Sequence, residues 1–92
     1  MNFVKIDPIK DRGELRYVEC VGNNHLQIVF ENGVYLQSYS TVVAAKIKGQ
    51  LFLNGKHDCS VTTNKYVKQF CGLSASDRRK GLVDGSILPL FV

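Results

Sequence analysis

The chain has 92 residues, of which 45% are hydrophobic and 22% are charged. This length allows one domain with one modest core, and the composition excludes a disordered or low-complexity chain. No apolar stretch approaches the roughly 20 residues that a membrane helix needs, and the first residues lack the pattern of a secretory signal. We therefore expect a single domain over residues 1–92, located in the cytoplasm and without a membrane partner.

The net charge of +4 is concentrated in the last third of the chain. Residues 1–60 hold seven Lys and Arg against six Asp and Glu, whereas residues 61–92 hold five against two. A basic patch of this kind favours an acidic or polyanionic partner.

The first third of the chain is rich in residues that favour strands and turns. Met1–Ile6 could form a strand that stops at Asp7-Pro8. Glu14–Val21 is a second candidate strand, and it ends at the turn cluster Gly22-Asn23-Asn24.

The clearest local pattern is a β-hairpin around Glu31-Asn32-Gly33. Apolar side chains alternate along the chain before and after this loop, as two paired strands require. We expect Gly33 to supply the positive φ of the turn and Tyr35 to lie opposite the buried face. The side chains predicted for the buried face are Leu26, Ile28, Phe30, Val34 and Leu36.

Two further strands are predicted at Thr41–Ile47 and Gln50–Leu53, joined by Lys48-Gly49 and followed by a turn at Asn54-Gly55. The pattern then changes from strands to helices. Ser60–Thr63 offers N-cap oxygens for a helix over Asn64–Cys71.

Gly72 should end this helix, and a second short helix is predicted from Ala75 to Val83 between Ser74 and Gly85. The tail Ile87–Val92 is too apolar to stay in water, so it should pack across the sheet or a helix, or form part of an interface. These patterns predict an α+β fold, with an antiparallel β-meander of four to six strands followed by one or two short C-terminal helices.

His57-Asp58-Cys59-Ser60 places four reactive side chains together. A Cys–His nucleophile needs the imidazole beside the sulfur and a third group to orient it. The sequence has no evident oxyanion site, its carboxylates are dispersed, and it contains no phosphate-binding glycine loop. We therefore interpret the segment as a polar connection with Cys59 tucked in, and we expect no enzyme activity, no catalytic residue and no cofactor.

The three cysteines, Cys20, Cys59 and Cys71, are odd in number and are not spaced as a disulfide framework. We expect reduced, partly buried thiols, as in a cytoplasmic protein. A metal site could draw on two of them together with His25 and His57, but the spacings match no structural zinc pattern. We predict no metal.

The candidate partner-binding residues are basic side chains of the last third and two tyrosines. They are Lys65, Lys68, Arg78, Arg79, Lys80, Tyr35 and Tyr39. The two lysines at positions 65 and 68 share one helix face, and together with the next three basic residues they could clamp phosphates or an acidic groove. The tyrosines should lie on one side of a strand as a platform for bases or for an interface. A solvated helix surface and simple coverage of the sheet are the alternative interpretations.

Three parts of the chain together resemble small proteins of tailed phages and prophages: Leu36–Ala44, Ser60–Thr63 and Phe70. The shared pattern is S-Y-x-T-x-V-A, a short hairpin, and S-x-T-T before a helix, and it covers roughly residues 30–73. The function of that family is unknown. The resemblance implies a phage protein acting in the host cytoplasm, similar in size and style to the anti-CRISPR inhibitors.

The leading functional hypothesis is an inhibitory binding protein that docks on a host protein or ribonucleoprotein, a CRISPR effector complex among the candidates, and blocks nucleic-acid access. Its contacts could include nucleic-acid phosphates. The alternatives are a direct nucleic-acid-binding protein of phage replication or transcription and a small virion or assembly component. The sequence leaves open the oligomeric state, and also whether the basic helical face or the sheet face is the binding surface.

Overall fold

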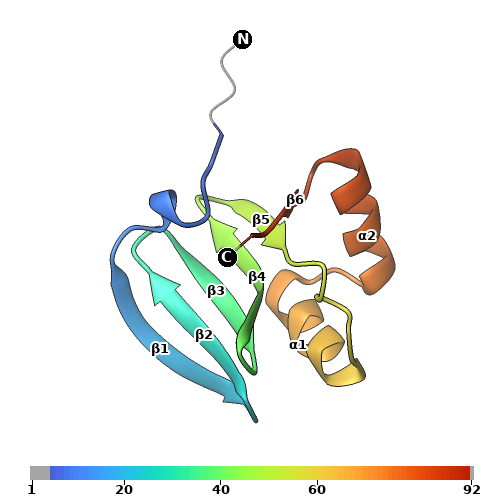
Figure 1. The fold of residues 1–92 in the computed structure, drawn as a ribbon, viewed down its shortest axis with the longest axis horizontal. Coiled ribbons are helices and arrows are strands. Elements are labelled where there is room, and N and C mark those ends of the chain that lie inside the picture. Colours follow the sequence, from blue (N-terminus) through green and yellow to red (C-terminus); the bar gives the residue numbers. More distant parts are fainter. Residues whose placement is uncertain (1–4, 92) are drawn as a thin grey trace.

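The computed structural model describes residues 5–91, which form one six-stranded sheet with two helices beside one of its faces (Figure 1). The strands are β1 (Leu15–Gly22), β2 (His25–Phe30), β3 (Gly33–Ser38), β4 (Thr41–Ile47), β5 (Gln50–Leu53) and β6 (Leu88–Pro89). The helices are α1 (Val61–Cys71) and α2 (Ala75–Asp84), and a 3-10 turn spans Lys10–Arg12. The strands lie side by side in chain order, with β1 to β5 antiparallel and β6 parallel to β5. The predicted α+β fold is confirmed.

The β2–β3 hairpin forms where the sequence predicts it, but with a loop that is one residue shorter than expected. Only residues 31–32 form the loop, so Phe30 pairs with Gly33. Because paired residues share a face of the sheet, Tyr35 lies beside the Phe30 ring, 4.7 Å between centroids, and Leu36 lies on the other face. Val34 and Leu36 were predicted to share a face with Phe30, and Tyr35 to lie opposite. The structure reverses this: Tyr35 shares the face of Phe30, and Val34 and Leu36 lie on the other face.

Gly33 permits a close approach between strands and is not the positive-φ residue of the turn. Its φ lies outside the left-handed region. A Cβ at this position would overlap the carbonyl oxygen of Lys46 and lie 2.6 Å from Cδ1 of Ile47. Positive φ values occur instead in the β4–β5 turn, at Lys48 (51°) and Gly49 (82°).

The sheet has a buried cluster on each face because successive residues of a strand point to opposite sides. The cluster away from the helices consists of Phe30, Tyr35, Ala45, Ile47, Phe52 and Leu90. The cluster beneath the helices consists of Leu36, Val43, Ala44, Leu53, Val67 and Ile87. The helices cover the second cluster, whereas Ile6 and Leu88 pack against the first.

Both predicted helices form, with caps at predicted residues but with bounds that differ by one to three residues. Ser60 caps α1 by accepting from Thr63 N (3.1 Å), so α1 begins three residues earlier than predicted. Ser74 caps α2 in the same way, and α1 and α2 end at Gly72 and Gly85, both with positive φ. Within residues 5–91, neither helix reaches the length and apolar character needed to cross a membrane.

The apolar tail packs on the sheet, as expected. Ile87 and Leu90 are buried, and Leu90 N donates to Leu53 O (2.9 Å). Phe91 is the exception, with 83% of its surface exposed. At the other terminus, residues 5–6 form no strand, and the rest of the strand predicted for Met1–Ile6 lies outside the described residues.

Candidate functional site

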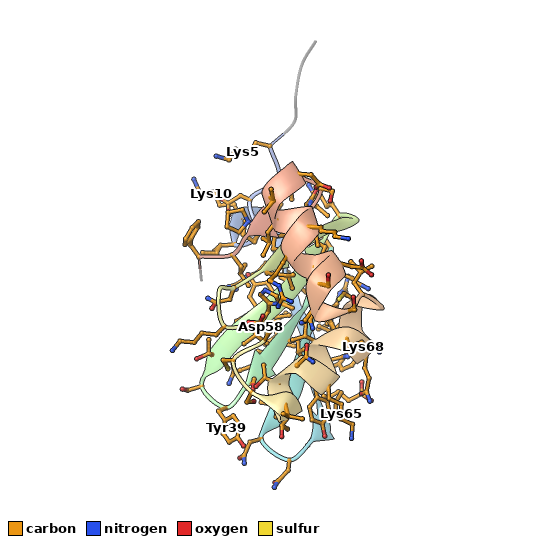
Figure 2. All side chains as sticks on the ribbon, turned by 90° about the vertical axis from the view of Figure 1, so that its right-hand side faces the viewer. Lys5, Lys10, Tyr39, Asp58, Lys65 and Lys68 are labelled. Atoms are coloured by element: carbon orange, nitrogen blue, oxygen red, sulfur yellow. The ribbon has the colours of Figure 1, made fainter. Side chains whose placement is uncertain are left out.

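The structure separates the predicted basic residues into an exposed set and one buried arginine. Lys65, Lys68, Arg79 and Lys80 are exposed, and Figure 2 shows Lys65 and Lys68 on the same side of α1. Arg79 Nη1 lies 2.8 Å from Asp58 Oδ2, so an internal carboxylate offsets its charge. We call the remaining three lysines, Lys65, Lys68 and Lys80, the helical basic set.

Arg78 does not belong to any surface patch, because it is fully buried. Its Nη1 donates to His57 O (3.0 Å) and lies 3.2 Å from His57 Nδ1, and its Nη2 donates to Asn64 Oδ1. The residue therefore ties α2 both to the loop before α1 and to α1 itself. The expectation that Arg78 contacts a partner is corrected, since the fold uses its donors internally.

Within the described residues the charge of Arg78 has no direct counter-ion. No carboxylate lies within ion-pair distance of it among residues 5–91, and its buried Nε has no acceptor there. Burial lowers the pKa of the Arg78 guanidinium, and burial also lowers the pKa of the His57 ring. An unpaired buried cation is costly, so the hydrogen bonds that Arg78 donates to His57 and Asn64 offset part of that cost.

The segment of four reactive residues does not assemble a nucleophile. His57 is buried and turned toward Arg78, whereas Cys59 is exposed. No hydrogen bond joins His57 to Cys59 in the part of the chain that the structure describes. The expectation that Cys59 is tucked in is corrected, and the segment forms the loop that Arg78 holds against α1.

The predicted tyrosine platform does not form. Tyr35 is only 2% exposed, and its hydroxyl donates to Pro8 O. Tyr39 is 62% exposed, because β3 ends at Ser38 and Tyr39 occupies the following turn with a φ of 55°. A single tyrosine, Tyr39, therefore remains on the surface from this pair.

A second buried polar network lies where α1 begins, and the sequence pattern did not predict this role for its histidine, His25. His25 Nδ1 donates to Asn23 O (2.6 Å), and the Ser38 hydroxyl lies 2.9 Å from Nε2. Ser38 Oγ is 3.0 Å from Thr63 Oγ1, which also accepts from the Ser60 hydroxyl (3.0 Å). This chain of hydroxyls fixes α1 to the ends of β2 and β3.

Aromatic rings enclose His25 on two sides. The Tyr66 ring stacks on it at 4.1 Å between centroids, and the Tyr39 ring meets it edge-on at 5.6 Å. Gly22 makes room for this arrangement, because a Cβ there would overlap the Tyr66 hydroxyl. One signal in the sequence could have revealed the network: Ser38 and Thr63 are hydroxyl residues at positions where a strand meets a turn and a helix begins.

A pocket of about 410 Å³ opens directly beside this network. Its lining consists mainly of hydroxyl-bearing side chains, together with one valine, one lysine and one cysteine: Ser38, Tyr39, Thr41, Val43, Lys56, Cys59, Ser60, Thr62 and Thr63. The pocket is thus lined by residues 38–43 and 56–63, two segments that the Ser38–Thr63 hydrogen bond brings together.

The three cysteines all lie in the described part of the chain and are free thiols. Cys20 and Cys59 are exposed, so the expected partial burial holds for Cys71 alone. Within residues 5–91 no group of three or more His, Cys, Asp or Glu side chains is arranged to hold a metal ion.

The comparisons with known proteins give a family. Residues 5–85 match the Family of unknown function (DUF8033), and because the match covers most of the chain, the protein belongs to this family. No curated protein matches the chain. No solved structure matches it either.

Proposed function

We propose that the protein is an inhibitory binding protein of phage origin that docks on a host protein or ribonucleoprotein in the cytoplasm and blocks its access to nucleic acid. A CRISPR effector complex is one candidate target. The resemblance of Leu36–Ala44 and Ser60–Thr63 to tailed-phage proteins supports a host target, and the excess positive charge of residues 61–92 supports an acidic or phosphate-bearing docking surface.

One observation carries the proposal: the helical basic set is exposed and free of internal carboxylates. No ion pair within residues 5–91 involves Lys65, Lys68 or Lys80. Three other cations are each paired, as Arg16–Glu31, Lys48–Asp11 and Arg79–Asp58. Lys5, Lys10 and Lys56 are also exposed without an ion pair among these residues, and the helical basic set differs from them in lying on two consecutive helices. Charges left free of internal partners are available to steer and orient a partner of opposite charge.

Binding also fits the two histidines better than catalysis does. His57 accepts from Arg78, and its pKa is lowered chiefly by burial, so the ring is engaged within the fold. His25 is fully buried between Tyr66 and the Ser38 hydroxyl. His25 thus stabilises a junction between the sheet and α1, and His57 a junction between α2 and the loop before α1.

Charge reversal tests the proposal. A tagged wild-type protein first retrieves its target from host lysate, and the dissociation constant is then measured by calorimetry. Lys65→Glu with Lys68→Glu should weaken binding at least about tenfold and flatten its salt dependence. Lys5→Glu with Lys10→Glu is the matched control, with the same charge change on exposed residues, and should change affinity little.

The melting temperature of both double variants should stay close to that of the wild type, because exposed substitutions of this kind change stability by about 0.5 kcal/mol or less. If the N-terminal pair abolishes binding and the helical pair does not, the sheet or its edge is the docking surface and the proposal is wrong.

A further inference from the structure

The pocket beside α1 has the size and construction of a small-ligand site. Its volume of about 410 Å³ lies within the range typical of such sites. Its floor is rigid, because Ser38 and Thr63 are buried and hydrogen-bonded to each other, and Ser38 is hydrogen-bonded in turn to His25. Hydroxyl-bearing residues of β4, the β5–α1 loop and α1 line the space beside this floor.

The lining chemistry favours a phosphate group. Lys56 is exposed and lines the pocket, and no carboxylate lines it. The hydroxyls of Thr41 and Thr62 line the same space and have no hydrogen-bond partner among the described residues. A lysine with unengaged hydroxyl donors is the combination that commonly holds phosphate oxygens.

An exposed aromatic ring stands at the edge of this pocket. Tyr39 is 62% exposed, and its backbone is fixed by two hydrogen bonds: its N–H donates to Asn24 O (2.7 Å), and its carbonyl accepts from Gln37 Nε2 (2.9 Å). Its ring rests edge-on against the buried His25 ring. The ring is thus already positioned, and stacking on it would cost little conformational entropy.

We infer that this pocket binds a nucleoside monophosphate unit, with the phosphate held by Lys56 and the two threonine hydroxyls and the base stacked on Tyr39. The unit could be a free nucleotide or one residue of a single strand. The site goes beyond the proposed function and does not use the helical basic set: Figure 2 shows Tyr39 on the opposite side of α1 from Lys65 and Lys68. Base stacking on one aromatic ring is worth about 1–3 kcal/mol, which is roughly five- to 150-fold in affinity.

The experiment titrates the whole chain with three probes: inorganic phosphate, thymidine monophosphate and an oligothymidylate of about ten nucleotides. Binding is followed by amide chemical shifts and by fluorescence anisotropy. The nucleotide should shift the amide signals of Tyr39, Thr41 and Thr62 more than phosphate alone does. Tyr39→Asn should weaken binding of the productive nucleotide probe about tenfold, and Asn tolerates the left-handed backbone that Tyr39 adopts.

The logarithm of the binding constant falls linearly with the logarithm of the salt concentration. Lys56→Ala should reduce the magnitude of this slope by about one, because one phosphate contact is lost. Tyr17→Ser and Lys65→Ala are the matched controls, since each removes an exposed side chain of the same type outside the pocket. Both controls should bind as the wild type does. Thermal melting of each variant confirms that it folds.

Binding of the mononucleotide identifies a free nucleotide as a sufficient ligand, and binding of the oligonucleotide alone identifies a strand. The inference is overturned if neither nucleotide probe binds, if phosphate alone reproduces the nucleotide's effect, or if Tyr39→Asn and Lys56→Ala bind normally. Because Lys65→Glu with Lys68→Glu should leave nucleotide binding intact, failure of this inference and failure of the proposed docking surface give different results.

Discussion

At one end of the sheet, β4 and β5 are covered on both faces, whereas at the other end β1 is held mainly by its pairing with β2. Val43 and Phe52 are at most 2% exposed. In β1, Leu15, Tyr17 and Val18 are each more than half exposed. The apolar character of a strand therefore does not by itself show whether the strand belongs to the core of this protein. A strand is buried where the helices and the two terminal segments cover it.

Both buried polar networks involve residues of the helices. One joins His25, Ser38 and Thr63, and the other joins His57, Asn64 and Arg78. Buried polar groups lose more when a partner is removed than exposed groups do, because water cannot replace the lost bond. Mutations should thus have much larger effects beneath the helices than on β1.

The largest expected effect is that of removing Arg78. Arg78→Ala leaves His57 O without its donor and opens a cavity, so it should lower the free energy of unfolding by about 3 kcal/mol. Arg79→Ala, one residue further on, breaks an exposed ion pair with Asp58 and should cost about 1 kcal/mol or less. Urea unfolding measures both.

Arg78→Met keeps most of the volume without the charge and should be milder than Arg78→Ala. Equal losses for Arg78→Ala and Arg79→Ala would contradict the structural role assigned to the buried guanidinium.

A nearly isosteric change compares the two ends of the sheet directly. Val43→Thr places a hydroxyl in the buried cluster beneath the helices and should cost about 1–3 kcal/mol. Val18→Thr makes the same change on the half-exposed strand β1 and should stay within about 0.5 kcal/mol. Thermal melting of the pair measures the difference, and a larger loss at Val18 would show that β1 is buried in solution, for example against a second chain.

The smallest expected effect is a dependence of stability on pH that comes from His57. Burial lowers its pKa in the folded protein, Asp58 acts in the opposite direction, and Arg78 and Arg79 lower it further. The unfolded chain, in which this histidine titrates near 6.5, therefore takes up a proton first as the pH falls. The contribution of His57 to stability is complete above pH 6.5 and decreases as the pH falls from there toward the folded pKa.

Urea unfolding between about pH 5 and pH 8 should show this loss in the wild type and a smaller loss in His57→Gln. The pKa values of Asp7 and Asp84 are lowered by backbone hydrogen bonds, from Lys10 N and Ser86 N respectively. The contributions of these two carboxylates to stability decrease as the pH falls below about 3.8, the ordinary pKa of an Asp side chain. They therefore do not overlap with the contribution of His57. An unchanged pH profile in His57→Gln would contradict the assignment.

The features that the sequence predicted well depend on a few neighbouring residues. The caps at Ser60 and Ser74 and the helix ends at Gly72 and Gly85 follow from local backbone chemistry. The β4–β5 turn at residues 48–49 was also predicted correctly from neighbouring residues, since β4 and β5 have the predicted bounds. Local rules predicted most of the fold for this reason.

The features that it predicted poorly depend on contacts between distant segments. A one-residue difference in the β2–β3 loop reversed the faces of β3, and periodicity alone does not fix the loop length. Arg78 was assigned to the surface because arginines are mostly exposed, and its acceptors on His57 and Asn64 lie more than ten residues away in the chain. The polar network at His25 was missed for the same reason.

The parallel pairing of β6 with β5 has a consequence for the order of folding. Each pair of successive strands from β1 to β5 is joined by only two residues, so the meander can form from local contacts. Leu88 and Leu90, in contrast, reach β5 only after both helices have been made. During synthesis the open edge of β5 must therefore wait for residues 88–90, and until then this edge is exposed to wrong pairing.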